Sequence, residues 1–205
     1  MVLEVDFTIA ALVIIVLLLP LYIYRKRIFK RFYKEGNSSE FIKDIYTYIK
    51  SNHPKADIDF SKIKKYFSEK DIERQQILIC EELAKQFANY AYELKTQSSI
   101  QDAHLWSSYQ QNSKLQKDNK FPPDWSQRKE LAWIRDKKEC NRCGLKVSQG
   151  DSNALLVKQM KHGGGFNLEN IVILCHDCSR VVRTSNPDRL SRDLHFMDNL
   201  LKKIH

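Results

Sequence analysis

Two short stretches decide the fold of this chain: Cys140-Asn-Arg-Cys143 and Cys175-His-Asp-Cys178, which are separated by 31 residues. Each C-x-x-C pair can place two thiolates on one metal ion at the tip of a tight turn, and two pairs complete a tetrahedral ligand set. A single pair is also found in redox sites, whereas two pairs at this spacing favour zinc over a redox pair or an iron–sulfur cluster. We therefore predict a structural Zn²⁺ held by Cys140, Cys143, Cys175 and Cys178.

The fifth cysteine, Cys80, lies in the apolar stripe of a predicted helix. We interpret it as a buried structural thiol and not a reactive one. An odd number of cysteines with paired spacing argues against a secreted disulfide scaffold. The pattern instead favours metal binding in a reducing compartment.

The charge of the chain is unevenly distributed. The formal net charge is +9, and residues 120–205 contribute sixteen Lys/Arg against ten Asp/Glu, whereas residues 35–119 are close to neutral. A basic C-terminal region is typical of proteins that bind a polyanion, most simply DNA or RNA. Charge alone is equally compatible with a solvated surface.

Near the N-terminus, residues 7–24 form an uncharged run rich in Leu, Ile and Val. As a helix, this run would span roughly 27 Å, close to the thickness of a bilayer core. Only acids precede it, and six basic residues follow within ten positions. The positive-inside rule then predicts a single-pass membrane protein with its N-terminus outside and its C-terminal domain cytoplasmic, compatible with a bacterial inner membrane. The alternative, a cleaved signal peptide, requires the reverse order of charges.

The middle of the chain, residues 35–119, is predicted to be a helical spacer. Phe41, Ile45 and Ile49 fall on one face of a first helix, and Ser68 is a candidate cap for a second, longer helix. The apolar stripe of that second helix can bind a protein partner or pack back on the zinc domain.

The predicted fold class is α+β, with an N-terminal transmembrane helix, a helical spacer and a C-terminal zinc module. The expected divisions are 1–34 for the anchor and its basic flank, 35–119 for the spacer and 120–205 for the zinc domain. In the last of these we expect a helix from Trp125, a strand over residues 153–160, a second over 171–174 and a helix from about Cys178.

The motifs of the zinc domain resemble the HNH endonuclease family, and in particular its four-cysteine, zinc-bearing members. The resemblance covers about residues 120–183 and rests on several ordered motifs. These motifs are Phe121-Pro-Pro-Asp-Trp125, Arg135-Asp136, Cys140-x-x-Cys143-Gly144, the glycines 163–165, Asn167-Leu-Glu-Asn170-Ile-Val-Ile-Leu-Cys175 and Cys178. The resemblance implies a ββα-metal, treble-clef-like core framed by zinc, with a second divalent ion, usually Mg²⁺, at the scissile phosphate.

The chain departs from the family pattern at the residues that perform catalysis. The resemblance implies a His-His or Asp-His pair where this chain has Lys158-Gln159, and a His where it has Ser179. Glutamine has no useful basicity for activating water, and a lysine ammonium repels a divalent cation. Of the implied catalytic set, only Asn170 is retained.

Three hypotheses about function remain open. In the first, the module keeps the zinc fold and binds DNA or RNA without nuclease chemistry, through Lys158, Lys161, Arg180 and Arg183. In the second, it is an active, Mg²⁺-dependent endonuclease in which His162 or His176 replaces the missing base. In the third, it is an assembly protein whose zinc stabilises an interaction domain and whose basic charge is incidental.

Overall fold

The computed structural model describes residues 14–20, 22–24, 38–111 and 121–204. The chain divides into two units, and Ser38–Ile204 form one of them. In the other unit, residues 14–20 and 22–23 are helical. Among the described residues, no helix is long and apolar enough to cross a membrane. This finding contradicts the predicted transmembrane helix over residues 7–24 and the single-pass topology built on it; residues 7–13, 21 and the basic flank at 25–34 lie outside the described residues.

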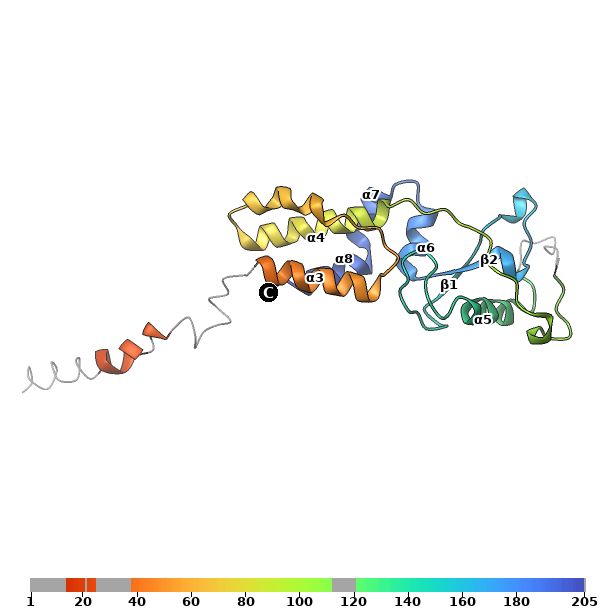
Figure 1. Ribbon diagram of the computed structural model, residues 1–205, viewed down its shortest axis with the longest axis horizontal. Coiled ribbons are helices and arrows are strands. Elements are labelled where there is room, and N and C mark those ends of the chain that lie inside the picture. The colour runs from red at the N-terminus through yellow and green to blue at the C-terminus, as the bar shows by residue number, and fades with distance from the viewer. Residues whose placement is uncertain (1–13, 21, 25–37, 112–120, 205) are drawn as a thin grey trace, which may run out of the picture. The chain divides into compact units, whose positions relative to one another are not determined.

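The larger unit begins with a helical hairpin. Helix α3 covers Ser38–Asn52, the 3₁₀ helix η1 covers Phe60–Ser68, and α4 covers Ile72–Asn89 (Figure 1). The apolar face predicted for α3 is buried, as expected. The cap of α4 is Asp71, whose carboxylate accepts hydrogen bonds from the next turn, and not Ser68, which ends η1.

Three short C-terminal helices complete the packing around α4. They are α7 (Pro187–Leu190), the 3₁₀ helix η5 (Ser191–Asp193) and α8 (His195–Leu201), and they lie beside α4 in Figure 1. The Phe87 and Phe196 rings stack with centroids 4.1 Å apart, and the His53 ring meets both edge-on. Helices from the two ends of the unit therefore share one aromatic core.

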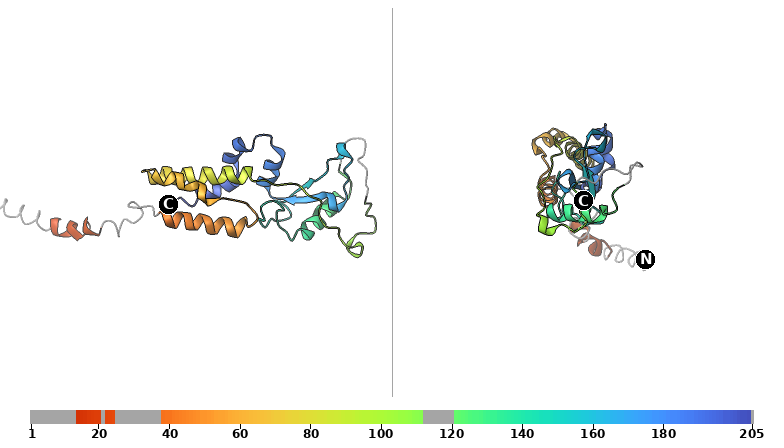
Figure 2. Two further views of the ribbon diagram at one scale, coloured as in Figure 1. Left: turned by 45° about the horizontal axis from the view of Figure 1, so that its top comes forward. Right: turned by 90° about the vertical axis from the view of Figure 1, so that its right-hand side faces the viewer.

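The remaining elements lie between these two groups of helices in the sequence. Helix α5 covers Trp125–Arg135, strand β1 Asn153–Leu156, strand β2 Ile171–Leu174 and helix α6 His176–Arg183. Short 3₁₀ helices occur at Asp102–His104, Met160–His162 and Leu168–Asn170. β1 and β2 pair antiparallel with Asn153 opposite Leu174 and Leu156 opposite Ile171, and α5 packs on β2 (Figure 2).

Two apolar cores position the cysteines. The larger core joins buried residues of α3, α4 and α8 to all four cysteines of the two pairs, whereas the smaller lies between α5 and β2. The helices predicted as a spacer therefore form part of the same compact unit as the cysteines. The described residues are mostly helical with one small two-stranded sheet, and no described helix can cross a membrane, so the predicted α+β class with an N-terminal transmembrane helix is wrong.

Candidate metal centre

The two cysteine pairs meet at one buried point. Cys140 and Cys143 lie in a turn before β1, Cys175 follows β2, and Cys178 lies in the first turn of α6. Their four sulfur atoms lie within 4.8 Å of one another, and the Sγ atoms of Cys143 and Cys175 are 3.8 Å apart. A tetrahedron with Zn–S bonds of about 2.3 Å has S–S edges of about 3.8 Å, while a disulfide requires about 2.0 Å. The four cysteines can therefore hold a metal ion such as zinc, as the sequence predicts.

The pKa values of the cysteine thiols depend on burial and on hydrogen bonds among them. Hydrogen bonds from the neighbouring thiols lower the pKa of Cys140, and burial raises the pKa of Cys178. A bound cation removes this conflict because every ligand can then be deprotonated. Cys80 lies outside the cluster; it is fully buried, and burial raises its pKa to about 12. The prediction that Cys80 is a buried structural thiol is confirmed.

The turn that carries the first pair is held against the α3–η1 loop. Gly144, directly after Cys143, has a φ of +82°, and a Cβ at this position would lie 2.8 Å from the Pro54 ring. The Lys55 N–H donates to the Cys143 carbonyl at 3.1 Å. Gly144 is therefore required both by its left-handed backbone and by the close approach of Pro54.

Arg142, between the first two cysteines, ties the metal ligands to the end of α4. Its side chain is 3 % exposed, and its Nη2 donates to the carbonyl oxygens of Phe87 and Ala88 at 2.9 and 3.2 Å. Its Nη1 lies 3.6 Å from the Cys178 sulfur, and its guanidinium lies 3.8 Å from the centre of the Tyr90 ring. One buried cation thus contacts a metal ligand and also satisfies carbonyls at the C-terminus of a helix.

The Arg135–Asp136 pair holds the same turn against the sheet. The Asp136 carboxylate accepts from the Arg135 Nε at 2.7 Å, from the Asn141 side chain at 2.6 Å and from the Ile173 N–H at 3.2 Å. Both residues of the pair are more than nine-tenths buried. The cysteine turn is therefore braced on one side by α4 and on the other by β2.

Asn170, the residue retained from the implied catalytic set, is buried at the far end of the hairpin from the cysteines. Its Oδ1 accepts from the Lys158 N–H at 2.7 Å, and its Nδ2 donates to the Lys158 and Gly165 carbonyls at 2.9 and 2.7 Å. These bonds close the loop from Lys158 to Gly165. They also explain why β1 ends at Leu156, earlier than the predicted strand over 153–160: the chain turns here around the Asn170 amide.

The four basic residues predicted to contact nucleic acid fall into two groups. Lys158, Lys161 and Arg183 are exposed. Arg183 lies near the loop that carries the two lysines, because it lines a cavity together with Gln159. Arg180 is half-buried and donates from Nη1 to the Asp193 carbonyl at 2.7 Å. Three of the four are therefore exposed cations, two on the loop that follows β1 and one at the end of α6.

The two histidines proposed as substitute bases lie far from one another along the hairpin. His162 is exposed in the loop beside Lys158. His176 starts α6 next to Cys175 and stacks on His195, with ring centroids 5.3 Å apart. Strand β2 separates His176 from Asn170, and six extended residues span about 20 Å. His176 and Asn170 are therefore not placed to act on one phosphate.

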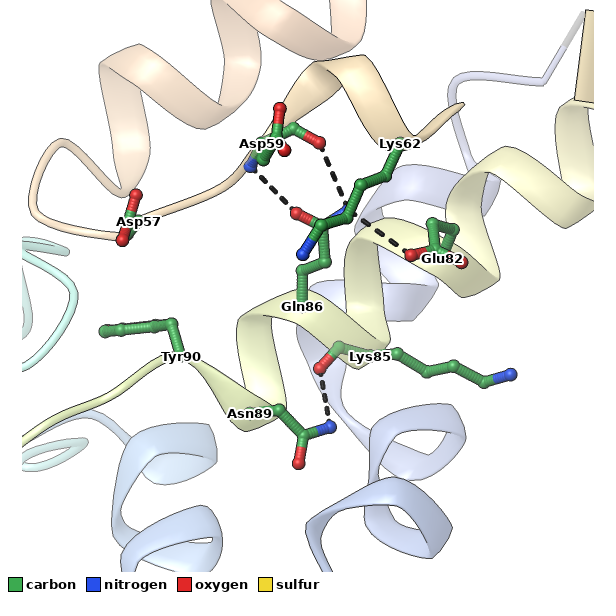
Figure 3. A pocket seen from close by; sticks show the side chains of 8 residues that line it. All are labelled: Asp57, Asp59, Lys62, Glu82, Lys85, Gln86, Asn89 and Tyr90. Atoms are coloured by element: carbon green, nitrogen blue, oxygen red, sulfur yellow. Dashed lines mark hydrogen bonds between the residues drawn. The ribbon is translucent and has the colours of Figure 1, made fainter. Parts of the chain in front are cut away.

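A second polar region lies along α4, away from the cysteines. Figure 3 shows a cavity of about 330 Å³ whose lining includes Asp57, Asp59 and Lys62. The Gln86 side chain accepts from the Asp59 N–H at 2.8 Å and donates to its carbonyl at 3.2 Å. Charges of both signs line this cavity, so it provides no concentrated field for a charged ligand.

Comparison with known proteins gives no relatives: no family model, curated protein or solved structure matches this chain. The resemblance to HNH endonucleases therefore stays a prediction. The sequence reasoning missed Arg142, whose carbonyl partners Phe87 and Ala88 lie more than fifty positions away in the sequence. Its place between two metal ligands was the one signal available.

Proposed function

We propose that this chain is a zinc-stabilised nucleic-acid-binding protein that does not hydrolyse phosphodiesters. Zinc is the proposed metal because four sulfur ligands select soft or borderline cations and, at the tetrahedral spacing described above, favour Zn²⁺. Four protein ligands leave no open position, so the ion supplies folding energy and not catalysis.

One observation carries the proposal: Lys158 and Lys161 are exposed on the loop at the end of the hairpin away from the metal, and Arg183 is exposed beside a cavity that Gln159 of this loop also lines. Within residues 38–111 and 121–204, no ion pair involves Lys158, Lys161 or Arg183. Some other basic residues of this unit, such as Lys65, are paired with carboxylates. Unpaired cations on one surface favour a polyanionic partner, and phosphates are the simplest one.

The absence of hydrolysis is proposed from the side chains at the same place. Asn170 uses its amide on backbone groups, which leaves it no free polar atom to orient water. Lys158 and Gln159 offer neither a base nor a divalent-metal ligand. The order β1, β2, α6 supports the resemblance to the ββα-metal fold. We therefore propose a protein of that fold type that does not hydrolyse phosphodiesters.

Binding is tested with the full, zinc-loaded chain and a fluorescein-labelled DNA duplex, followed by anisotropy between 50 and 300 mM salt. If two phosphates are contacted, the Lys158→Glu/Lys161→Glu variant should reduce the slope of log K against log salt by about 1.8. The matched control is Lys62→Glu/Lys85→Glu, which reverses two exposed lysines, one on η1 and one on α4. The proposal would be overturned if both variants weakened DNA binding equally, or if the affinity did not depend on the salt concentration.

Hydrolysis is tested separately on supercoiled plasmid with Mg²⁺ and with Mn²⁺. We expect no nicking above a metal-free control. Nicking that is lost in His162→Ala, a variant of an exposed side chain, would instead establish the endonuclease hypothesis.

A further inference from the structure

The two edges of the β1–β2 sheet differ in how their backbone groups are satisfied. On the outer edge of β2, the N–H and C=O groups of Ile171 and Ile173 all have partners. These partners are the Leu168 carbonyl, the Arg135 guanidinium, the Asp136 carboxylate and the Asn141 N–H. Such coverage is how folded proteins protect a sheet edge from further pairing.

The outer edge of β1 has no such coverage. Ala154 lies opposite Ile173 and Leu156 opposite Ile171, so both also direct their N–H and C=O groups away from the partner strand. The hydrogen bond from the Val157 N–H to the Asn170 carbonyl at 2.8 Å fits this alternation. In the described part of the chain, no hydrogen bond engages those outward groups of Ala154 or Leu156.

A cavity of about 490 Å³ runs along this open edge. Its lining includes Ala154 and Leu156 of the strand together with Phe121, Trp125 and Arg183. The lining is mostly apolar, and its one charged residue is a cation. Phe121, whose ring stacks on Trp125 at 4.5 Å, is 59 % exposed. An unpaired strand edge, an apolar cavity and a positive charge therefore coincide.

We propose that the outer edge of β1 binds an extended, acidic segment of a partner protein as a third strand. The main chain of that segment pairs with the outward groups of Ala154 and Leu156, which provides affinity without sequence specificity. An apolar side chain fills the cavity beside Trp125, and a carboxylate of the segment pairs with Arg183. No carboxylate lines the cavity in the described residues, so the charge complementarity favours an acidic partner.

The test uses two synthetic hexapeptides, one alternating glutamate with valine and one alternating lysine with valine, and the full zinc-loaded chain. By fluorescence anisotropy, the glutamate peptide should bind at least about tenfold more tightly than the lysine peptide. Amide hydrogen exchange of Ala154 and Leu156, followed by NMR, should slow on binding. The Leu155 amide, which faces β2, should change little.

Two variants separate strand addition from simple contact with the cavity. Ala154→Pro removes an N–H that has no partner in the free protein, which an edge strand tolerates, and it should weaken the glutamate peptide at least about tenfold. Circular dichroism and metal content establish that this variant is folded. Arg183→Glu should reverse the order of affinities, so that the lysine peptide binds more tightly than the glutamate peptide. This second variant tests the proposal even if Ala154→Pro does not fold.

Three outcomes would overturn the proposal. One is that the glutamate peptide binds no better than the lysine peptide. Another is that a single-stranded oligothymidylate occupies the cavity without protecting the Ala154 amide, which would assign the cavity to bases stacking on Phe121. The last is that, without any peptide, hydrogen exchange of the Ala154 amide slows as the protein concentration rises. That result would show that a second copy of the chain occupies the edge. Ala154→Pro leaves Lys158, Lys161 and Arg183 in place, so this variant can lose peptide binding while it keeps DNA binding.

Discussion

Replacement of Arg142 by Met tests whether one buried cation holds the metal centre to the helices. Met keeps most of the length and apolar stem of the side chain but removes its donors to the carbonyls of Phe87 and Ala88, at 2.9 and 3.2 Å, and to the Cys178 sulfur, at 3.6 Å. Charged hydrogen bonds contribute about 1.5–3 kcal/mol each, and the contact with the Tyr90 ring about 1 kcal/mol. Because these contributions are not additive, we expect a loss of about 3–5 kcal/mol in the free energy of unfolding.

The assay is urea unfolding of the zinc-saturated full chain, monitored by far-UV circular dichroism and analysed by linear extrapolation. Arg142→Lys, which retains the charge without the planar set of donors, should fall between the wild type and Arg142→Met. The matched control is Arg192→Met: this side chain is 66 % exposed and is paired with Glu81 at 3.4 Å, so its loss should cost less than about 1 kcal/mol.

A second measurement follows the metal itself. Residues that hydrogen-bond metal ligands typically change affinity by about 10–100-fold when they are removed, so Arg142→Met should release zinc to a chromogenic chelator more readily. If Arg142→Met unfolds within about 1 kcal/mol of the wild type and retains zinc equally well, the proposed link between α4 and the metal is refuted.

Three further predictions concern the metal, acid stability and the loop. Cys178→Ser should lose bound metal and helical circular dichroism signal together. Cys80→Ala, which changes a buried thiol outside the cluster, should keep its metal content. Elemental analysis and circular dichroism of both variants check this prediction. Burial lowers the pKa of His53 from 6.5 to about 4. The contribution of its neutral ring to the free energy of unfolding is therefore complete above pH 6.5 and is lost as the pH falls toward 4. That change amounts to about 3 kcal/mol. In a His53→Phe variant kept saturated with metal, the free energy of unfolding should therefore depend less on pH between 6.5 and 4. An unchanged dependence on pH would exclude His53 as the cause. Asn170→Ala should remove three partly buried hydrogen bonds and cost about 2–4 kcal/mol, with faster amide exchange at Lys158; normal exchange there would contradict the bracing role.

The sequence allowed the ligand set and several local features to be predicted because their causes are local. The spacing within each cysteine pair specifies a turn that can bind a metal, and the buried face of α3 follows from its helical periodicity. The start of α5 at Trp125 was also predicted, although the Asp124 carboxylate pairs with Arg128 at 2.8 Å instead of capping the helix.

Residues 7–24 satisfy the hydropathy and charge rules, yet no described helix is long and apolar enough to cross a membrane. The other failures have non-local causes. The end of β1 depends on Asn170, which approaches Lys158 only after the chain has reversed. The role of Arg142 depends on α4, and the packing of α4 against α7 and α8 joins segments about a hundred positions apart. Patterns within a window of one helix cannot reveal such partners.

The order of the elements has a consequence for synthesis of the protein. The stacked pair of Phe87 and Phe196 joins α4 to α8, and the whole metal-binding region is made between them. While the chain is being made, α3 and η1 can cover one part of the apolar surface of α4, but the part that contacts α8 stays exposed until α8 has left the ribosome. Closing that contact brings together segments very distant in sequence, which slows folding. A nascent chain stalled before His195 would be an expected client of chaperones even with its metal already bound.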